Sequence, residues 1–294
     1  MRSLAQGVRG SHHLHDSLAR NLAPAPPAAC LAGFVPARGP APREEVPIGP
    51  ETTARRPLVS IVTTAWNHSH LLKNFIRTLG AVTPPEWAAK TELVVVDNAS
   101  VDDTAPFLDD WRQTKGGIHF KQVIHADTNR GYAGGSNLGI CAARGEFVLL
   151  VNNDVLFDSN VIEYCLRAYQ GSPRAVLGRQ LIWRRGPWNS LNGQAVRYLE
   201  GWCLFASAAI YRELGFWKDT TFAGVFDETF SPAFFEDIDL SLRASLKQIA
   251  LRQVAIPIRH LGSRTTKTTP NFPYLRVVRE NHQKFVAKWR HLHE

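Results

Sequence analysis

A polar triplet directly after an apolar run is the first place where this sequence could do chemistry. The run Phe147-Val148-Leu149-Leu150-Val151 has the length and composition of a strand buried on both faces of a parallel sheet, and Asn152-Asn153-Asp154 follows it at once. In an open α/β sheet, ligands bind at the carboxyl ends of the strands. Asp154 therefore lies where a carboxylate can meet a substrate or a metal ion.

Three carboxylates in one predicted helical turn form the second candidate group. Glu236, Asp237 and Asp239 follow two phenylalanines, and apolar residues then recur at helical spacing, at Ile238, Leu242, Leu246 and Ile249. A carboxylate held against aromatic surface tends to have a raised pKa, which suits a general base. Acids in a first turn also complement the helix dipole, and we interpret Asp239 as a helix-capping residue.

Two more polar residues follow predicted strands. Asp97 ends the apolar run 93–96, whereas Asp102 and Asp103 open the next helix, where acids commonly cap free amides. His260 follows a short strand late in the chain, where a lone histidine is most often structural or exposed. Asp97 thus has less structural reason to be acidic than the two residues that follow it.

A glycine-rich stretch precedes the polar triplet. Residues 129–139 read Asn-Arg-Gly-Tyr-Ala-Gly-Gly-Ser-Asn-Leu-Gly, and residues 136–144 have a short helical pattern. We expect the helix to begin after a small-residue turn at Gly134-Gly135.

In this order, the segments resemble the inverting nucleotide-sugar glycosyltransferases of family 2, which have the GT-A fold, in their rhamnosyltransferase-like bacterial branch. The family pattern is Asn-x-Gly-(small)-x-x-x-Asn-x-Gly, an apolar strand, a D-x-D-type triplet, a Glu-Asp-x-Asp motif and a late histidine. The resemblance runs from about residue 57 to the end of the chain. Asn152 replaces the first carboxylate of the triplet, which leaves Asp154 as its only charged member.

The resemblance implies a role for individual residues. Asp154 and His260 would bind a divalent cation, with Asn152 as a weak third ligand. Asp237 would deprotonate the acceptor hydroxyl, while Glu236 would hold the acceptor or orient the base, and Trp202 would lie on the acceptor side. Ser263, Thr265 and Thr266 match the segment after the family's histidine, and Arg264 and Lys267 could meet the diphosphate. The nucleotide-sugar site would comprise Thr64, Trp66, Asn67, Asp97, Asn129, Gly131, Gly134, Asn137, Asn153 and Asp154.

The chemistry that the resemblance implies is a single displacement at the anomeric carbon. A metal ion would neutralise the leaving diphosphate as a Lewis acid while the acceptor oxygen attacks the far face of the sugar. A carboxylate and an imidazole suit Mn²⁺ well and Mg²⁺ adequately. The expected partners are a UDP- or dTDP-sugar and a glycan or lipid-linked saccharide of the cell surface.

The elements that must position these residues alternate between strand and helix. Strands are predicted at 58–64, 93–96, 118–125, 147–151 and 175–183, with helices between them, which is typical of an α/β fold with a mostly parallel, Rossmann-like sheet flanked by helices. The GT-A reading divides one domain, 57–270, into a nucleotide-binding half, 57–183, and an acceptor half, 184–270. The apolar run 202–211 could be a strand or a short buried helix.

The two ends of the chain differ from this domain. Residues 1–56 are rich in Pro, Ala and Arg, and we interpret them as a disordered leader. Residues 271–294 form a basic amphipathic helix, for which packing on the domain is favoured and docking on an anionic membrane surface is the alternative.

Composition excludes several classes of protein. The 294 residues carry a formal net charge of +8, which favours anionic partners, but no zinc-finger or RNP-type motif indicates nucleic acid. The four cysteines are scattered, as expected in a reducing cytosol, and no apolar run approaches the roughly 20 residues that span a bilayer. We therefore expect a cytoplasmic protein, with peripheral contact at the inner face of the membrane as the alternative.

Two alternative functions were considered, and the sequence gives a reason against each. A sugar nucleotidyltransferase would have a Gly-Gly-x-Gly-Thr-x-Leu loop after the first strand, and a dinucleotide-binding fold would have G-x-G-x-x-G there; this chain has Thr63-Thr64-Ala65-Trp66-Asn67 instead. A non-catalytic nucleotide-sugar or glycan-binding relative is the other alternative, and the retention of Asp97, Asp154, Asp237 and His260 argues against it.

Overall fold

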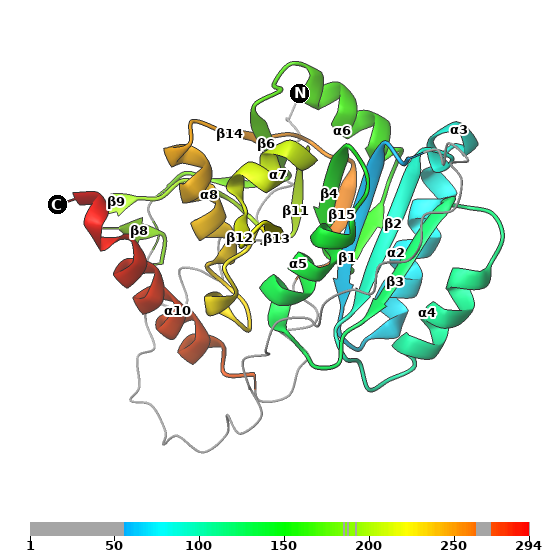
Figure 1. Ribbon diagram of the computed structural model, residues 1–294, viewed down its shortest axis with the longest axis horizontal. Coiled ribbons are helices and arrows are strands. Elements are labelled where there is room, and N and C mark those ends of the chain that lie inside the picture. Colours follow the sequence, from blue (N-terminus) through cyan, green and yellow to red (C-terminus); the bar gives the residue numbers. More distant parts are fainter. Residues whose placement is uncertain (1–55, 185, 187, 192, 263–271, 294) are drawn as a thin grey trace, which may run out of the picture.

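The computed structural model describes residues 56–184, 186, 188–191, 193–262 and 272–293. A seven-stranded sheet in the order β14-β6-β11-β4-β1-β2-β3 forms its centre (Figure 1). Neighbouring strands are parallel except at β11, which runs antiparallel to β4 and β6. The prediction of a mostly parallel sheet is confirmed. The strands are β1 (Val59–Ala65), β2 (Thr91–Asp97), β3 (Phe120–His125), β4 (Phe147–Val151), β6 (Ala175–Gly178), β11 (Cys203–Ser207) and β14 (Ala250–Gln253).

Helices cover both faces of this sheet because its central strands are apolar on both sides. On β1, Val59 and Ile61 pack in one core cluster, while Val62 belongs to a second cluster on the opposite face. The first face carries α2 (Ser69–Val82), α4 (Thr104–Gln113) and α6 (Val161–Gln170). The second face carries α5 (Gly131–Ala142), α7 (Ala208–Leu214) and α8 (Glu236–Leu246).

Short elements complete the fold around the sheet edges. The most informative is an antiparallel pair of β5 (Val155–Phe157) and β15 (Ile258–His260), which aligns His260 with Val155. That pairing brings the end of β15 to the residues that follow β4. The others are α3 (Pro85–Ala88), β7 (Leu181–Ile182), β8 (Ser190–Leu191), β9 (Gln194–Ala195), β10 (Tyr198–Leu199), β12 (Phe216–Lys218), β13 (Thr221–Gly224), η1 (Glu228–Phe230) and η2 (Arg290–His293).

The glycine-rich stretch forms a longer helix than the sequence suggested. Helix α5 begins at Gly131 rather than at residue 136, so Gly134 and Gly135 lie inside it and the predicted turn there is wrong. These glycines allow close packing instead. A Cβ added to Gly135 would lie 2.5 Å from Cγ2 of Thr64, and one added to Gly139 would lie 2.4 Å from Cγ1 of Val62. The glycines therefore let α5 lie directly on β1.

Two other boundaries differ from the prediction. The expected strand 175–183 is broken into β6 and β7, and β7 pairs with β10 outside the main sheet. The apolar run 202–211 contains both expected alternatives, since β11 ends at Ser207 and α7 follows at once. Ser207 separates them by capping the helix, because its hydroxyl accepts a hydrogen bond from the backbone N–H of Ile210.

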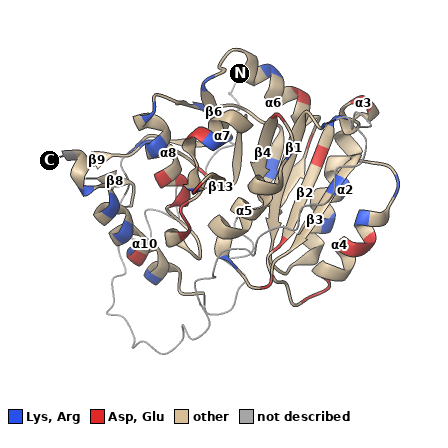
Figure 2. Ribbon diagram, in the orientation of Figure 1, with Lys and Arg blue, Asp and Glu red and all other residues tan. Residues whose placement is uncertain are grey.

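The C-terminal helix α10 (Tyr274–Trp289) packs its apolar stripe against the domain. Val278, Phe285 and Trp289 belong to a buried cluster with Phe230 and Ile238. Several Lys and Arg residues lie along this helix (Figure 2). The packing interpretation is confirmed for this stripe, and contact with a membrane stays a prediction.

No helix within the described ranges combines the length and the hydrophobicity that crossing a bilayer requires. The predicted leader, 1–56, lies outside the described residues apart from Arg56. The same holds for Ser263, Arg264, Thr265, Thr266 and Lys267, so the roles expected for them stay predictions.

Candidate active site

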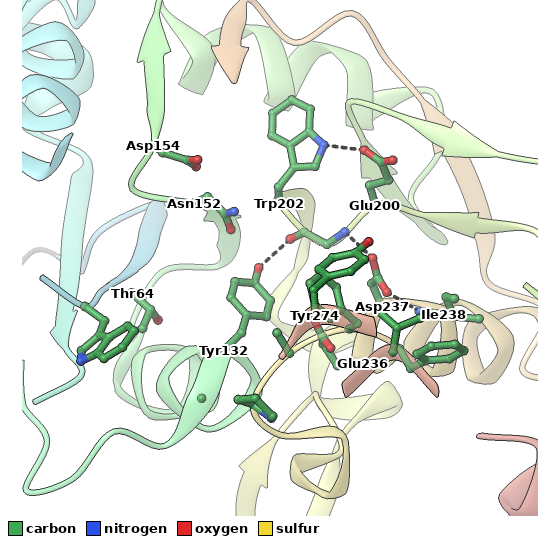
Figure 3. Close-up of a pocket in the computed structure, with 18 of the residues that line it drawn as sticks. Thr64, Tyr132, Asn152, Asp154, Glu200, Trp202, Glu236, Asp237, Ile238 and Tyr274 are labelled. Carbon is green, nitrogen blue, oxygen red and sulfur yellow. Dashed lines mark hydrogen bonds between the residues drawn. The ribbon is translucent and has the colours of Figure 1, made fainter. Parts of the chain in front are cut away.

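A cavity of about 400 Å³ lies where β1 and β4 end. Figure 3 shows its two ends: Thr64, Asn152 and Asp154 lie toward one, and Glu200, Asp237 and Tyr274 lie toward the other. We call these the donor end and the acceptor end. Trp202 and Tyr132 stand between them. The predicted site residues that line this cavity are Thr64, Trp66, Asn129, Gly131, Asn152, Asn153, Asp154, Trp202, Glu236, Asp237 and His260.

The structure brings together the two residues predicted to bind a metal ion. Oδ1 of Asp154 and Nε2 of His260 are 3.1 Å apart, although the residues are more than a hundred positions apart in sequence. The β5/β15 pairing produces this meeting, and the N–H of Leu261 donates to the backbone carbonyl of Asp154 at 2.9 Å. The imidazole also stacks on the indole of Trp202, with ring centroids 4.4 Å apart and an angle of 11° between the planes.

This donor pair fits a divalent cation. Two ligand atoms each roughly 2.1 Å from a metal, and adjacent around it, are separated by about 3 Å, which is the separation seen here. The buried Oδ1 of Asn152 accepts no hydrogen bond from the described part of the chain and could take a third position. No cluster of three or more His, Cys, Asp or Glu in the described ranges could hold a metal ion. The protein would therefore supply few ligands, and the remaining positions would be left for a diphosphate or water.

An asparagine network shapes the backbone at the donor end. The side-chain NH₂ of Asn98 donates to Oδ1 of Asn129 and to the carbonyl of Gly131, both at 3.0 Å, and Oδ1 of Asn129 accepts from the N–H of Gly131 at 2.8 Å. Gly131 has φ +68°, and a Cβ there would lie 2.5 Å from Oγ of Ser231. Asn98 lines the cavity and was missed from the sequence, where it reads as one more polar residue after β2.

Four residues expected to contact the nucleotide sugar lie outside the lining of the cavity. These are Asn67, Asp97, Gly134 and Asn137. Asp97 accepts hydrogen bonds from the N–H of Ser100 and from His125, while Asn137 holds the backbone of Val225 and Phe226. In this structure Asn137 and Gly134 serve contacts of α5 with the segment before α8, where both lie close to Glu228.

At the acceptor end, Asp237 is held by two backbone amides. The N–H of Gly201 donates to its Oδ2 at 3.0 Å, and the N–H of Ile238 donates to its Oδ1 at 2.8 Å. Burial in the cavity wall raises the pKa of Asp237 to about 6. The carboxylate is therefore largely ionised at neutral pH and is more basic than an ordinary aspartate, as a general base requires.

Glu236 is the most confined carboxyl group of the site. The residue is 6% exposed, and its Oε2 has no hydrogen-bond partner in the described ranges. Burial, and then the neighbouring Asp237 carboxylate, raise the pKa of Glu236 well above its ordinary value. This group therefore favours its protonated form, which can donate a hydrogen bond.

A strained backbone aims these two carboxyl groups at the cavity. Phe234 and Phe235 have φ values of 73° and 79°, a left-handed conformation that is unfavourable for large side chains. The ring of Phe235 is held between Phe230, His282 and Phe285. Helix α8 starts directly after this turn, so aromatic packing fixes where its first residues point.

The acceptor end contains residues that the sequence did not single out. Glu200 accepts a 2.9 Å hydrogen bond from the indole N–H of Trp202, and the Tyr132 hydroxyl donates to the carbonyl of Gly201 at 2.7 Å. Tyr198 and Tyr274 also line the cavity. A weak signal for Glu200 was its place beside the Gly201-Trp202 turn, but an isolated acid on an ordinary loop has no distinctive pattern.

The capping interpretation of Asp239 is wrong. Asp239 points away from the cavity, is fully buried, and accepts from Nε of Arg243 and Nε1 of Trp289, each at 2.9 Å. Nζ of Lys288 lies 2.6 Å from its Oδ1. Asp239 thus joins α8 to α10, which helical periodicity alone could not reveal.

Comparison with known proteins agrees with this arrangement. A family model described as "Glycosyl transferase family 2" matches residues 60–222. The poly-beta-1,6-N-acetyl-D-glucosamine synthase of Staphylococcus epidermidis is 26% identical over 126 residues, 42% of this chain and 29% of that protein. The low-salt glycan biosynthesis hexosyltransferase Agl10 of Haloferax volcanii is 21% identical over 225 residues, 67% of this chain and 65% of that protein. The chain spans less than two thirds of the length of either relative.

A solved structure shares the fold. The mannosyltransferase PcManGT from Pyrobaculum calidifontis, in complex with GDP-Man and Mn²⁺, superposes with a TM-score of 0.53 at 16% identity. The match covers 80% of this chain and 64% of that one.

Proposed function

This chain belongs to glycosyl transferase family 2 and has the GT-A fold, and on that basis we propose that it transfers a sugar, with inversion, from a nucleoside-diphosphate sugar to a hydroxyl group of a cell-surface glycan. The observation that carries this proposal is the meeting of Asp154 and His260 at 3.1 Å in one cavity with the amide-held carboxylate of Asp237. One end of the cavity suits a metal-bound diphosphate, and the other suits the activation of a hydroxyl group.

At the donor end, Asp154 and His260 would hold a divalent cation, and Asn152 would contribute its amide oxygen. The ion would supply Lewis-acid stabilisation of the leaving diphosphate. The stacking of His260 on Trp202 and the packing of Asp154 beside β5 fix the directions of these two side chains. Metal binding would then need no rearrangement of either ligand. PcManGT, which shares the fold, is known in complex with Mn²⁺.

At the acceptor end, Asp237 would take the proton from the attacking hydroxyl group. Its two backbone amide donors fix the orientation of the carboxylate, and its pKa of about 6 makes it a stronger base while leaving it ionised at neutral pH. Glu236, whose pKa burial raises well above its ordinary value, would donate a hydrogen bond to the acceptor in its protonated form. Tyr132 and Trp202 would separate the two ends and limit access of water to the donor.

The experiment that tests this proposal is the melting temperature of the protein with UDP, dTDP and GDP, and with sugars linked to each, with and without Mn²⁺. A ligand that binds only the folded state stabilises it, by about 2.7 kcal/mol when its concentration is a hundred times the dissociation constant. This stabilisation raises the melting temperature. We expect a metal-dependent increase with one nucleotide, which Asp154→Ala should weaken. The absence of any increase with every nucleotide and metal would contradict the proposal.

A further inference from the structure

The acceptor end of the cavity collects carboxyl groups, and no cation among its described lining residues balances them. Glu200, Glu236 and Asp237 all line it. Among the described residues that line the cavity there is no Lys and no Arg, and the one basic side chain, His260, is paired with Asp154 at the donor end. Figure 3 shows Glu200 and Asp237 close together at this end, with Glu236 below them.

The remaining wall of the acceptor end is aromatic. Trp188, Tyr198, Phe234 and Tyr274 line it, and the rings of Phe234 and Tyr274 are in edge contact at 5.0 Å between centroids. Such rings offer flat apolar surface together with hydroxyl groups. An aromatic wall beside a few carboxyl groups suits a ligand that has one apolar face and several hydroxyl donors, as a pyranose ring does.

From this composition we propose that the acceptor presents an uncharged sugar residue to the cavity, and that Glu200 helps to select it against sugars that carry a carboxylate or a phosphate. This inference rests on the proposed glycosyl transfer. Hydroxyl groups can donate to Glu200 and Asp237, whereas an anionic substituent would lie among carboxyl groups with no cation of the described lining to pair with. Selection of this kind works by penalising the wrong ligand rather than by adding contacts to the right one.

Position explains why Glu200 can act in this way. Its Oε2 is fixed by the indole N–H of Trp202, whose ring in turn stacks on His260. Trp202 thus links Glu200 to the Asp154–His260 pair, and Figure 3 shows Glu200 close to Asp237. Burial, and then the Asp237 carboxylate, already raise the pKa of Glu200. A bound anion would add to this repulsion and would also favour protonation of Asp237, which would disable the base.

The test uses matched sets of methyl glycosides built on glucose, galactose and mannose. Each set contains the neutral glycoside, its uronic acid and its 6-phosphate. Binding of each compound is titrated by saturation-transfer NMR. The protein is kept with the nucleotide that raised its melting temperature and with Mg²⁺, which is diamagnetic. We expect at least one neutral glycoside to bind, and its two anionic counterparts to bind about tenfold more weakly or worse. In Glu200→Gln, which keeps an oxygen for the Trp202 indole, this ratio should fall. The surface variant Glu213→Gln should keep it, because Glu213 pairs with Arg174 and neither residue lines the cavity.

The outcomes separate this inference from the proposed function. The inference would be overturned if the protein binds a nucleotide but binds neutral and anionic glycosides equally, or binds no neutral glycoside. Either result would leave the transferase proposal standing. An unchanged ratio in Glu200→Gln would overturn the role of Glu200. Failure of every nucleotide to bind would contradict the proposed function itself, and the glycoside titrations would then not be needed to reject it.

Discussion

The carboxyl groups in the first turn of α8 lie in two different environments. Glu236 and Asp237 face the cavity and have no Lys or Arg among the described residues that line it with them. Asp239, two residues later, faces the protein interior, where Arg243, Lys288 and Trp289 surround it. Asp237 and Asp239 are two residues apart, which corresponds to about 200° around a helix, so these two members of one short acidic motif lie in different environments.

This difference separates function from stability within a single helical turn. On the interior side, two cations and an indole N–H compensate a fully buried charge, which fastens α8 to α10. On the cavity side, burial raises the pKa of Glu236 and Asp237, and Oε2 of Glu236 has no partner among the described residues, so keeping these groups there carries a cost that no cation of the described lining offsets. Such a cost is typical of residues retained for chemistry or binding.

The largest effect should come from removing the charge on the cavity side. Asp237→Asn keeps an oxygen that can accept from the N–H of Gly201, so the fold should persist. Because the amide cannot take a proton, we expect the transfer rate to fall about 10³-fold. The measurement is the turnover rate with a donor and acceptor pair, together with the melting temperature.

A matched observation on the wild-type protein sharpens this prediction. With a pKa of about 6 for Asp237, kcat/KM should be nearly flat above neutral pH and should fall as pH drops below about 6, because the base becomes protonated. Nucleotide binding by Asp237→Asn should match the wild type. Equal transfer rates for the two proteins would refute the assignment of the base.

The next largest effect should come from the interior side. Asp239→Asn removes the fully buried anion that the half-buried Arg243 and Lys288 share, although Lys288 keeps its pair with Asp227, so we expect the free energy of unfolding to fall by about 3 kcal/mol. Chemical denaturation measures this loss. The matched control is Glu280→Gln, which breaks the exposed ion pair with Arg276 on the same helix and should change stability far less. Similar losses in both variants would mean that the buried network contributes little.

The smallest effect has the opposite sign. Glu236→Gln removes a buried carboxylate whose pKa is raised by burial and by Asp237, so we expect the free energy of unfolding at neutral pH to rise by about 1 kcal/mol. A raised folded-state pKa means that the ionised group destabilises the fold at high pH, and that this cost disappears as pH falls towards the ordinary value of 4.5. The gain should therefore be larger at pH 7.5 than at pH 5. A loss of stability at both pH values would contradict this account.

Much of the structure around the donor end of the cavity could be predicted from local sequence. Apolar runs of strand length gave β1, β2 and β4 to within a residue or two, and the polar triplet after β4 lines the cavity as expected. These features depend on residues that are close in sequence, since a strand's period and the position of its end need no distant partner. The choice of family rested on the order of such segments, and the family match at residues 60–222 confirms it.

The acceptor end of the cavity was harder to predict because its contacts are distant in sequence. Glu200, Tyr132, Tyr198 and Tyr274 approach Asp237 only once β10, α5, α8 and α10 have packed together. A turn was predicted at Gly134-Gly135, but Gly135 lies inside α5 and, like Gly139, allows the helix to pack closely on β1, which no local pattern could reveal. Local propensity describes the backbone of one segment, whereas the environment of a side chain depends on every element around it.

By itself, the sequence determined the order of strands and helices and which carboxylates are available for chemistry. The tertiary structure decided which of them meet: it joined His260 to Asp154 through the β5/β15 pairing and turned Asp239 away from Asp237. The physical reason is that a carboxyl group's pKa and partners are set by burial and by charges within a few ångströms, and those neighbours come from distant parts of the chain.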